Sequence, residues 1–119
     1  MSGAPLPSQG ERRRLANRRA AETFEFESAG QRYTCTVGRF TDDSIGELFL
    51  NGSKSNSTAD TNARDAAITF SIAVQHGADP EAIRRGLSRD SQGRATGPLG
   101  AALDHIARLN LVSSKETSR

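Results

Sequence analysis

The sequence predicts an α+β fold in which a three-stranded antiparallel meander is followed by three helices packed on one face of the sheet. Two observations carry this prediction. Between residues 22 and 50, apolar residues alternate with polar ones in three short runs separated by turn-forming residues. From residue 62 onward they recur every three or four residues, which is the helical period. Strands followed by helices, rather than alternating with them, indicate an α+β layer.

The first two strands are predicted as a hairpin. Phe24 and Phe26 share one face of the first strand, with glutamates alternating between and after them. Residues 28–31 form a turn. In the run that follows, every second residue is again apolar or weakly polar: Tyr33, Cys35 and Val37.

The third strand is predicted from Ile45 to Leu50, after a turn at residues 41–44 whose short polar side chains bond their own backbone. Leu48, Phe49 and Leu50 are consecutive, so this strand carries apolar residues on both faces. Such a strand suits the middle of the packing or a contact with another protein.

The first helix is predicted to begin after Asn62 as N-cap and to end at Gly77. Ile68 and Ile72 are expected to widen its apolar stripe. The many alanines predict a close approach to the sheet. The stripe consists of Ala63, Ala66, Ala67, Phe70, Ala73 and Val74.

Two further helices follow. Asp79 as N-cap and Pro80 at the first helical position open the second helix. Residues 89–97 form a polar connection, and Pro98 starts a third helix whose apolar spacing continues to Leu109.

Charge and composition divide the chain into a basic, disordered arm (residues 1–20), a single α+β domain (21–112) and a solvated tail (113–119). The arm contains five arginines and one glutamate, a net charge of +4, whereas the remainder carries −2. Only 34% of residues are hydrophobic, so the core is expected to be thin. A thin core predicts modest stability or an oligomer that buries a further face.

Cysteine usage and hydropathy favour a cytoplasmic protein. Cys35 is the single cysteine, which excludes an internal disulfide and a multi-cysteine zinc site. No apolar run approaches the roughly twenty residues that span a bilayer, and no apolar segment follows the N-terminal arginines as in a secretory signal. No membrane association is expected.

No catalytic constellation is evident, so neither enzymatic activity nor a cofactor is predicted. His76 and His105 are isolated histidines near expected helix ends, and metal binding would need three or four converging ligands. An enzymatic alternative would require Asp60, Asp65 and Asp90 to converge.

A loop with one lysine joins the third strand to the first helix. Its Gly-Ser-Lys-Ser segment lacks the second glycine of a P-loop, and its helix begins too late. A plain polar loop or a weaker anion-binding loop remain as interpretations. The candidate ligand- or partner-binding residues are Asn51, Lys54, Ser55, Asn56, Asn62, Arg64, Arg89 and Arg94.

The arm offers an alternative, the binding of nucleotide or nucleic acid together with the Lys54 loop. Its arginines could neutralise phosphates, although no aromatic residues interleave with them to stack bases. They are Arg12, Arg13, Arg14, Arg18 and Arg19.

Several motifs occur in a recognisable order over residues 22–106. They include Glu47-Leu48-Phe49-Leu50, Lys54-Ser55, the alanine-rich helix from Ala63 to Gly77, Glu81-Ala82-Ile83 and Gly97-Pro98-Leu99-Gly100. In this order they resemble the C-terminal TSCPD-type accessory domain of adenosylcobalamin-dependent ribonucleotide reductases and its short stand-alone relatives. The family domains usually carry metal-binding cysteines and a terminal redox pair, whereas this chain has only Cys35.

The resemblance therefore implies the architecture of an accessory domain without its redox chemistry. We expect a non-catalytic accessory or regulatory domain that binds a protein partner. A homo-oligomer is a further option. The alternative is a nucleotide- or nucleic-acid-binding protein that uses the arginine arm and the Lys54 loop.

Overall fold

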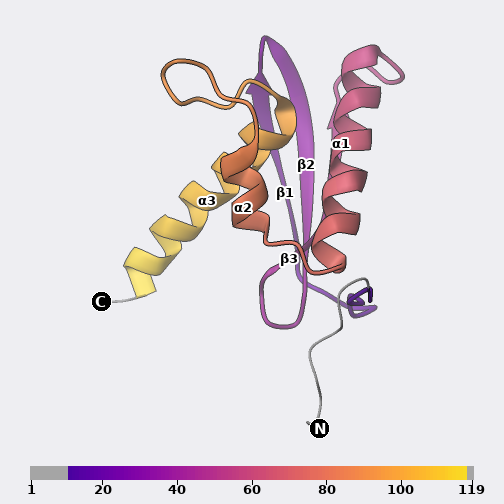
Figure 1. The fold of residues 1–119 in the computed structure, drawn as a ribbon, viewed down its shortest axis with the longest axis vertical. Helices are drawn as coiled ribbons and strands as arrows, with labels where there is room; N and C mark the ends of the chain where they lie inside the picture. The colour runs from indigo at the N-terminus through magenta and orange to yellow at the C-terminus, as the bar shows by residue number, and fades with distance from the viewer. Residues whose placement is uncertain (1–10, 118–119) are drawn as a thin grey trace, which may run out of the picture.

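The computed structural model describes residues 11–117, with side chains described as far as residue 110. It confirms the α+β order of three strands followed by three helices (Figure 1). The elements are β1 (Ala21–Ser28), β2 (Gln31–Arg39), β3 (Ile45–Gly52), α1 (Thr58–Gln75), α2 (Pro80–Gly86) and α3 (Pro98–Thr117).

The sheet is an antiparallel meander in the order β1-β2-β3. Ala29 and Gly30, both with positive φ, close the first hairpin, which is the backbone conformation of a two-residue I′ turn. Cys35 pairs with Phe24 on one side and with Leu50 on the other, so these three residues share one face of the sheet.

The helices cover this face and enclose a small core. In the view of Figure 1, α1 lies to the right of the strands, beside β3, and α2 and α3 lie to their left. Ala63 and Ala67 are buried, and their small side chains allow α1 to approach β3 closely. The core consists of Tyr33, Cys35, Val37, Phe40, Leu48, Leu50, Ala63, Ala67, Phe70, Val74, Ala102, Leu103 and Ile106.

The predicted N-cap of the first helix, Asn62, is wrong. The cap is Ser57, whose Oγ accepts a hydrogen bond from the backbone N–H of Asp60 at 3.1 Å, and α1 begins at Thr58. Ser57 with Asp60 three residues later satisfies the same capping pattern that Asn62 and Asp65 suggest. Asn62 is an exposed residue inside the helix.

The other helix starts agree with the sequence. The Asp79 side chain accepts from the backbone N–H of Glu81 at 3.1 Å, with Pro80 as the first residue of α2. Pro98 is the first residue of α3. The tail predicted from residue 113 is helical as far as Thr117. Between residues 11 and 117, no helix combines the length and apolar character that crossing a bilayer requires.

Part of the N-terminal arm lies against the base of the domain. Residues 1–10 lie outside the described residues, and residues 11–20 form neither helix nor strand. Leu15 packs against the core and contacts Gly46, where a Cβ atom would lie 2.8 Å from the Leu15 Cδ2 atom. The backbone N–H of Arg13 donates to the carbonyl of Gln75. These contacts differ from the free arm that the sequence predicts.

Candidate functional site

Three large apolar side chains are exposed on α1 and on the solvent face of β3. Leu48 and Leu50 point into the core, so Phe49 between them points outward and is 51% exposed. On α1, Ile68 and Ile72 are one turn apart and each is 54% exposed. We call Phe49, Ile68 and Ile72 the apolar patch. The sequence predicts apolar residues on both faces of the third strand, and the structure exposes Phe49 on one of them.

A shallow groove of about 280 Å³ runs between β3 and α1. Phe49 and Ile68 both line it, so the strand and helix parts of the patch meet on one surface. Asn51 and Arg64, two of the candidate binding residues, line the same groove. The Arg64 side chain is 55% exposed and therefore places a cation at the rim.

Polar side chains of α1 bind the outer edge of β3 and fix the two walls of this groove. The backbone N–H of Leu48 donates to the Ser71 hydroxyl at 2.8 Å. The Gln75 amide donates to the carbonyl of Gly46 at 2.8 Å, and the N–H of Gly52 donates to Asp60 at 2.8 Å. Helix and strand are therefore joined near both ends of the groove, which makes the groove preorganised.

The Lys54 loop is closed by a carboxylate from the same chain. One Asp60 oxygen accepts from Gly52 N–H, and the other accepts from Asn56 N–H at 3.0 Å. Bonds from Gly52 first, and then from Asn56, hold the pKa of Asp60 below its usual value. The backbone N–H groups of Gly52 and Asn56, which could otherwise bind an external anion, therefore already donate to Asp60. Lys54 and Ser55 are exposed.

Arg89 and Arg94 lie apart from the other candidate residues, in the connection between α2 and α3. Arg89 binds both carboxylate oxygens of Asp104, at 2.8 and 2.9 Å. This bidentate pair ties the connection to α3. The Nε atom of Arg94 lies 3.2 Å from Asp90, and Arg94 lines a cleft that does not include Arg64.

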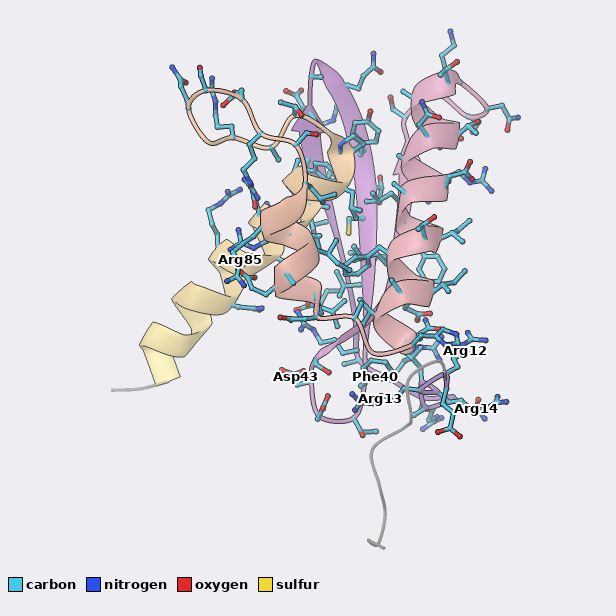
Figure 2. All side chains as sticks on the ribbon, in the orientation of Figure 1. Arg12, Arg13, Arg14, Phe40, Asp43 and Arg85 are labelled. Atoms are coloured by element: carbon cyan, nitrogen blue, oxygen red, sulfur yellow. The ribbon has the colours of Figure 1, made fainter. Side chains whose placement is uncertain are left out.

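Three of the five arm arginines are engaged within the chain. Arg12 donates to the Gln75 side chain at 2.7 Å, and Arg19 lies 2.7 Å from Glu47. The Arg13 guanidinium lies 3.8 Å from the centroid of the Phe40 ring and 3.1 Å from Asp42. Figure 2 shows Arg12, Arg13 and Arg14 gathered near Phe40 at the base of the domain. Arg14 and Arg18 are exposed.

Sequence reasoning missed two members of the apolar patch, because Ile68 and Ile72 were assigned to the buried stripe. At 3.6 residues per turn they lie about 140° and 180° around α1 from Ala63, whereas Ala67, Phe70 and Val74 lie within about 40° of it. The helical angle was therefore a signal that could have identified them.

Candidate metal ligands do not cluster among the described residues, and the single thiol is buried. No group of three or more His, Cys, Asp or Glu residues between positions 11 and 117 is placed to hold a metal ion. Burial raises the pKa of the Cys35 thiol to about 12. Asp60 and Asp90 are each engaged by their own loop, where backbone N–H groups donate to them.

No protein-family model, no characterised protein and no solved structure matches this chain. The resemblance to the TSCPD-type domain therefore remains a prediction from the sequence motifs.

Proposed function

We propose that this protein is a non-catalytic accessory or regulatory domain that acts by binding a protein partner. The observation that carries the proposal is the apolar patch, in which Phe49, Ile68 and Ile72 are each more than half exposed. Exposed apolar side chains that gather on one surface mark protein contacts more often than scattered ones do.

The energetics of burial favour the same interpretation. Covering a large apolar side chain contributes about 1.5–3 kcal/mol, so three such side chains could form the centre of a binding interface. The walls of the groove are already joined by Ser71, Gln75 and Asp60, so little ordering would be needed on binding.

The resemblance to the reductase accessory domain supports an accessory role in which the redox chemistry of the family is absent. Cys35 is the single cysteine of the chain and is buried in the core. We therefore carry over the architecture of the family domain but propose no role in electron transfer.

The nucleic-acid alternative has less support. Arg12, Arg13 and Arg19 bind residues of the same chain, and Asp60 takes up two backbone amides of the Lys54 loop. Both the arginine arm and the Lys54 loop therefore already bind groups of the same chain, which leaves fewer of their donors for a nucleic acid.

A capture experiment with matched surface variants tests the proposal. The immobilised wild-type protein is exposed to an extract of its source cells, and the bound proteins are identified by mass spectrometry. The variant Phe49→Ser/Ile68→Ser is expected to lose a partner that the wild type retains. Leu109→Ser is the control, because Leu109 is 48% exposed on α3 and lies outside the patch.

Two results would contradict the proposal. One is a wild-type protein that captures no partner and remains a monomer in light scattering. The other is a partner that the Phe49→Ser/Ile68→Ser variant retains as well as the Leu109→Ser control does.

A further inference from the structure

One face of the sheet remains open to solvent. Cys35, Val37 and Leu50 pack with α1 and α3 in the core, so the alternate positions of each strand point to the opposite face. We call these positions the open face; they are residues 23, 25 and 27 of β1, 32, 34 and 36 of β2, and 49 and 51 of β3. All of them are exposed except Thr34 and Thr36, which are half-buried in the middle strand. The open face therefore extends the apolar patch across the breadth of the sheet.

The strand register arranges the open face in rows, and one row has opposite charges at its two ends. Glu25 of β1 pairs with Thr34 of β2, which in turn pairs with Asn51 of β3. Arg64 of α1 lines the groove together with Asn51, so a guanidinium group ends the row that a carboxylate begins. The next residue of α1, Asp65, does not line this groove. The row is therefore acidic at the β1 margin and basic at the α1 margin.

The neighbouring row carries no charge. Thr23 of β1 pairs with Thr36 of β2, which pairs with Phe49 of β3, and Ile68 lies across the groove from Phe49. The hydroxyls of Thr23 and Thr36 are hydrogen-bonded to each other at 3.0 Å, so covering them leaves fewer polar groups without a partner. The centre of the open face therefore gains from burial, whereas its margins carry the charges.

The charges at the two margins are incompletely matched within the chain. Glu25 and Glu27 lie 2.8 and 3.5 Å from the same side chain, Arg32, so two carboxylates share one guanidinium group. The nearest nitrogen of Arg64 lies 3.7 Å from Asp60, which is longer than a hydrogen bond. The β1 margin therefore presents an excess of negative charge, and the α1 margin presents an exposed guanidinium group.

We propose that the open face binds a second copy of this chain, an inference that rests on the proposed function and names its protein partner. A two-fold axis parallel to the strands, between β2 and β3, keeps each row at its height along the strands and reverses it from end to end. Arg64 of each copy then lies over Glu25 of the other. Phe49 of each copy lies over Thr36 of the other, and the two sheets pack face to face.

A second copy is favoured over an unrelated partner because the open face is complementary to itself. The acidic margin of one copy meets the basic margin of the other, and the uncharged centre meets an uncharged centre. The face comprises three short strands and one side of α1, which is small for a stable dimer. We therefore expect a weak dimer, with a Kd of about 10–100 μM.

Sedimentation velocity of the full chain between about 1 and 500 μM tests for this dimer. The wild type is expected to change from monomer to dimer over the range. Phe49→Ser should remain monomeric, because it removes the largest apolar side chain from the centre of the open face. Leu109→Ser, at an exposed position of α3 outside the open face, is the control and should dimerise as the wild type does. Circular dichroism of each variant checks that the fold is retained.

Charge reversal tests the two-fold geometry. Arg64→Glu places two carboxylates against each other at both symmetric contacts, and Glu25→Arg places two guanidinium groups there. Each variant alone should therefore self-associate about tenfold more weakly than the wild type or worse. An equimolar mixture of the two variants restores opposite charges at both contacts and should form a heterodimer about as readily as the wild type dimerises.

Arg85→Glu is the matched control for this charge reversal. Its side chain is 67% exposed on α2, which in the view of Figure 2 lies to the left of the strands, whereas α1 lies to their right. It should dimerise as the wild type does and should not restore association when mixed with Glu25→Arg.

Three results would overturn the inference: a wild type that stays monomeric throughout the range, a dimer that Phe49→Ser leaves unchanged, or a charge-reversed mixture that stays monomeric while the wild type dimerises. Failure of the inference is distinguishable from failure of the proposed function. A monomeric protein that captures a different partner through Phe49 and Ile68 would keep the proposed function and exclude the second copy as its partner.

Discussion

The Asp60 carboxylate, in the first turn of α1, accepts a hydrogen bond from the backbone N–H of Gly52 at the end of β3, over 2.8 Å. Its other oxygen accepts from Asn56 in the intervening loop. One buried side chain therefore joins the end of a strand, the loop after it and the start of a helix. These two hydrogen bonds fix the conformation of the Lys54 loop.

Replacement of Asp60 by Asn should lower the midpoint of urea unfolding at pH 7, because the amide offers one acceptor oxygen in place of two and carries no charge. The folded pKa of Asp60 lies below its ordinary value of 3.8. The stabilisation by the carboxylate is therefore present above that pH and is lost as the pH falls through the folded pKa. The difference between wild type and variant should shrink accordingly below about pH 4. Asp65→Asn, an exposed change on the same helix, is the control and should leave the midpoint nearly unchanged at both pH values.

Replacement of Gly46 by Ala should release the N-terminal segment. The new Cβ atom would lie 2.8 Å from Leu15 Cδ2 and 3.2 Å from a Phe40 ring carbon, so Leu15 must move. Trypsin should then cleave faster after the arginines between residues 12 and 19, with the remaining domain intact by mass spectrometry. Gly86→Ala is the matched control, since no atom lies within 4 Å of its added Cβ. Equal cleavage rates in the two variants would show that Leu15 does not hold the segment.

Truncation of one buried and one exposed residue of α1 should distinguish residues that stabilise the fold from those of the apolar patch. Phe70 is 2% exposed, and Phe70→Ala should lower the free energy of unfolding by about 3–5 kcal/mol. Ile68→Ala, at an exposed position of the same helix, should change it by only about 0.5 kcal/mol. Urea unfolding followed by circular dichroism measures both. A large loss for Ile68→Ala would mean that the patch serves folding rather than binding.

His105 should make stability depend on pH. Burial first, and then the neighbouring Arg108, lowers the folded pKa of His105 from 6.5. The unfolded chain therefore takes up this proton more readily, and stability is lost as the pH falls below about 6.5. In Arg108→Ala the pKa of His105 should rise but stay below 6.5, because burial against Phe24 remains. NMR titration of the imidazole protons gives both values, and an unchanged pKa in the variant would exclude Arg108 as a cause.

The sequence predicts the secondary structure well because the alternating and helical periods are local patterns. It predicts apolar residues on both faces of the third strand, but not that Phe49 is the one that faces solvent. The assignment of Asn62 as N-cap failed because Ser57 meets the same local requirements five residues earlier. Ser and Asn are both favoured N-cap residues, so N-cap preference alone does not decide between Ser57 and Asn62.

Contacts between distant parts of the chain were beyond sequence reasoning. Leu15 is a single apolar residue in a basic segment, and nothing nearby indicates that Gly46 leaves room for it. The bidentate pair between Arg89 and Asp104 also joins two separate elements.

The position of α1 along β3 limits how the sheet can grow. Ser71 and Gln75 occupy backbone groups on that margin, so an added strand could join only beside β1. Two copies joined in this way would form a sheet with an α1 helix at each end. Strand-by-strand association of the folded protein would therefore stop at a pair.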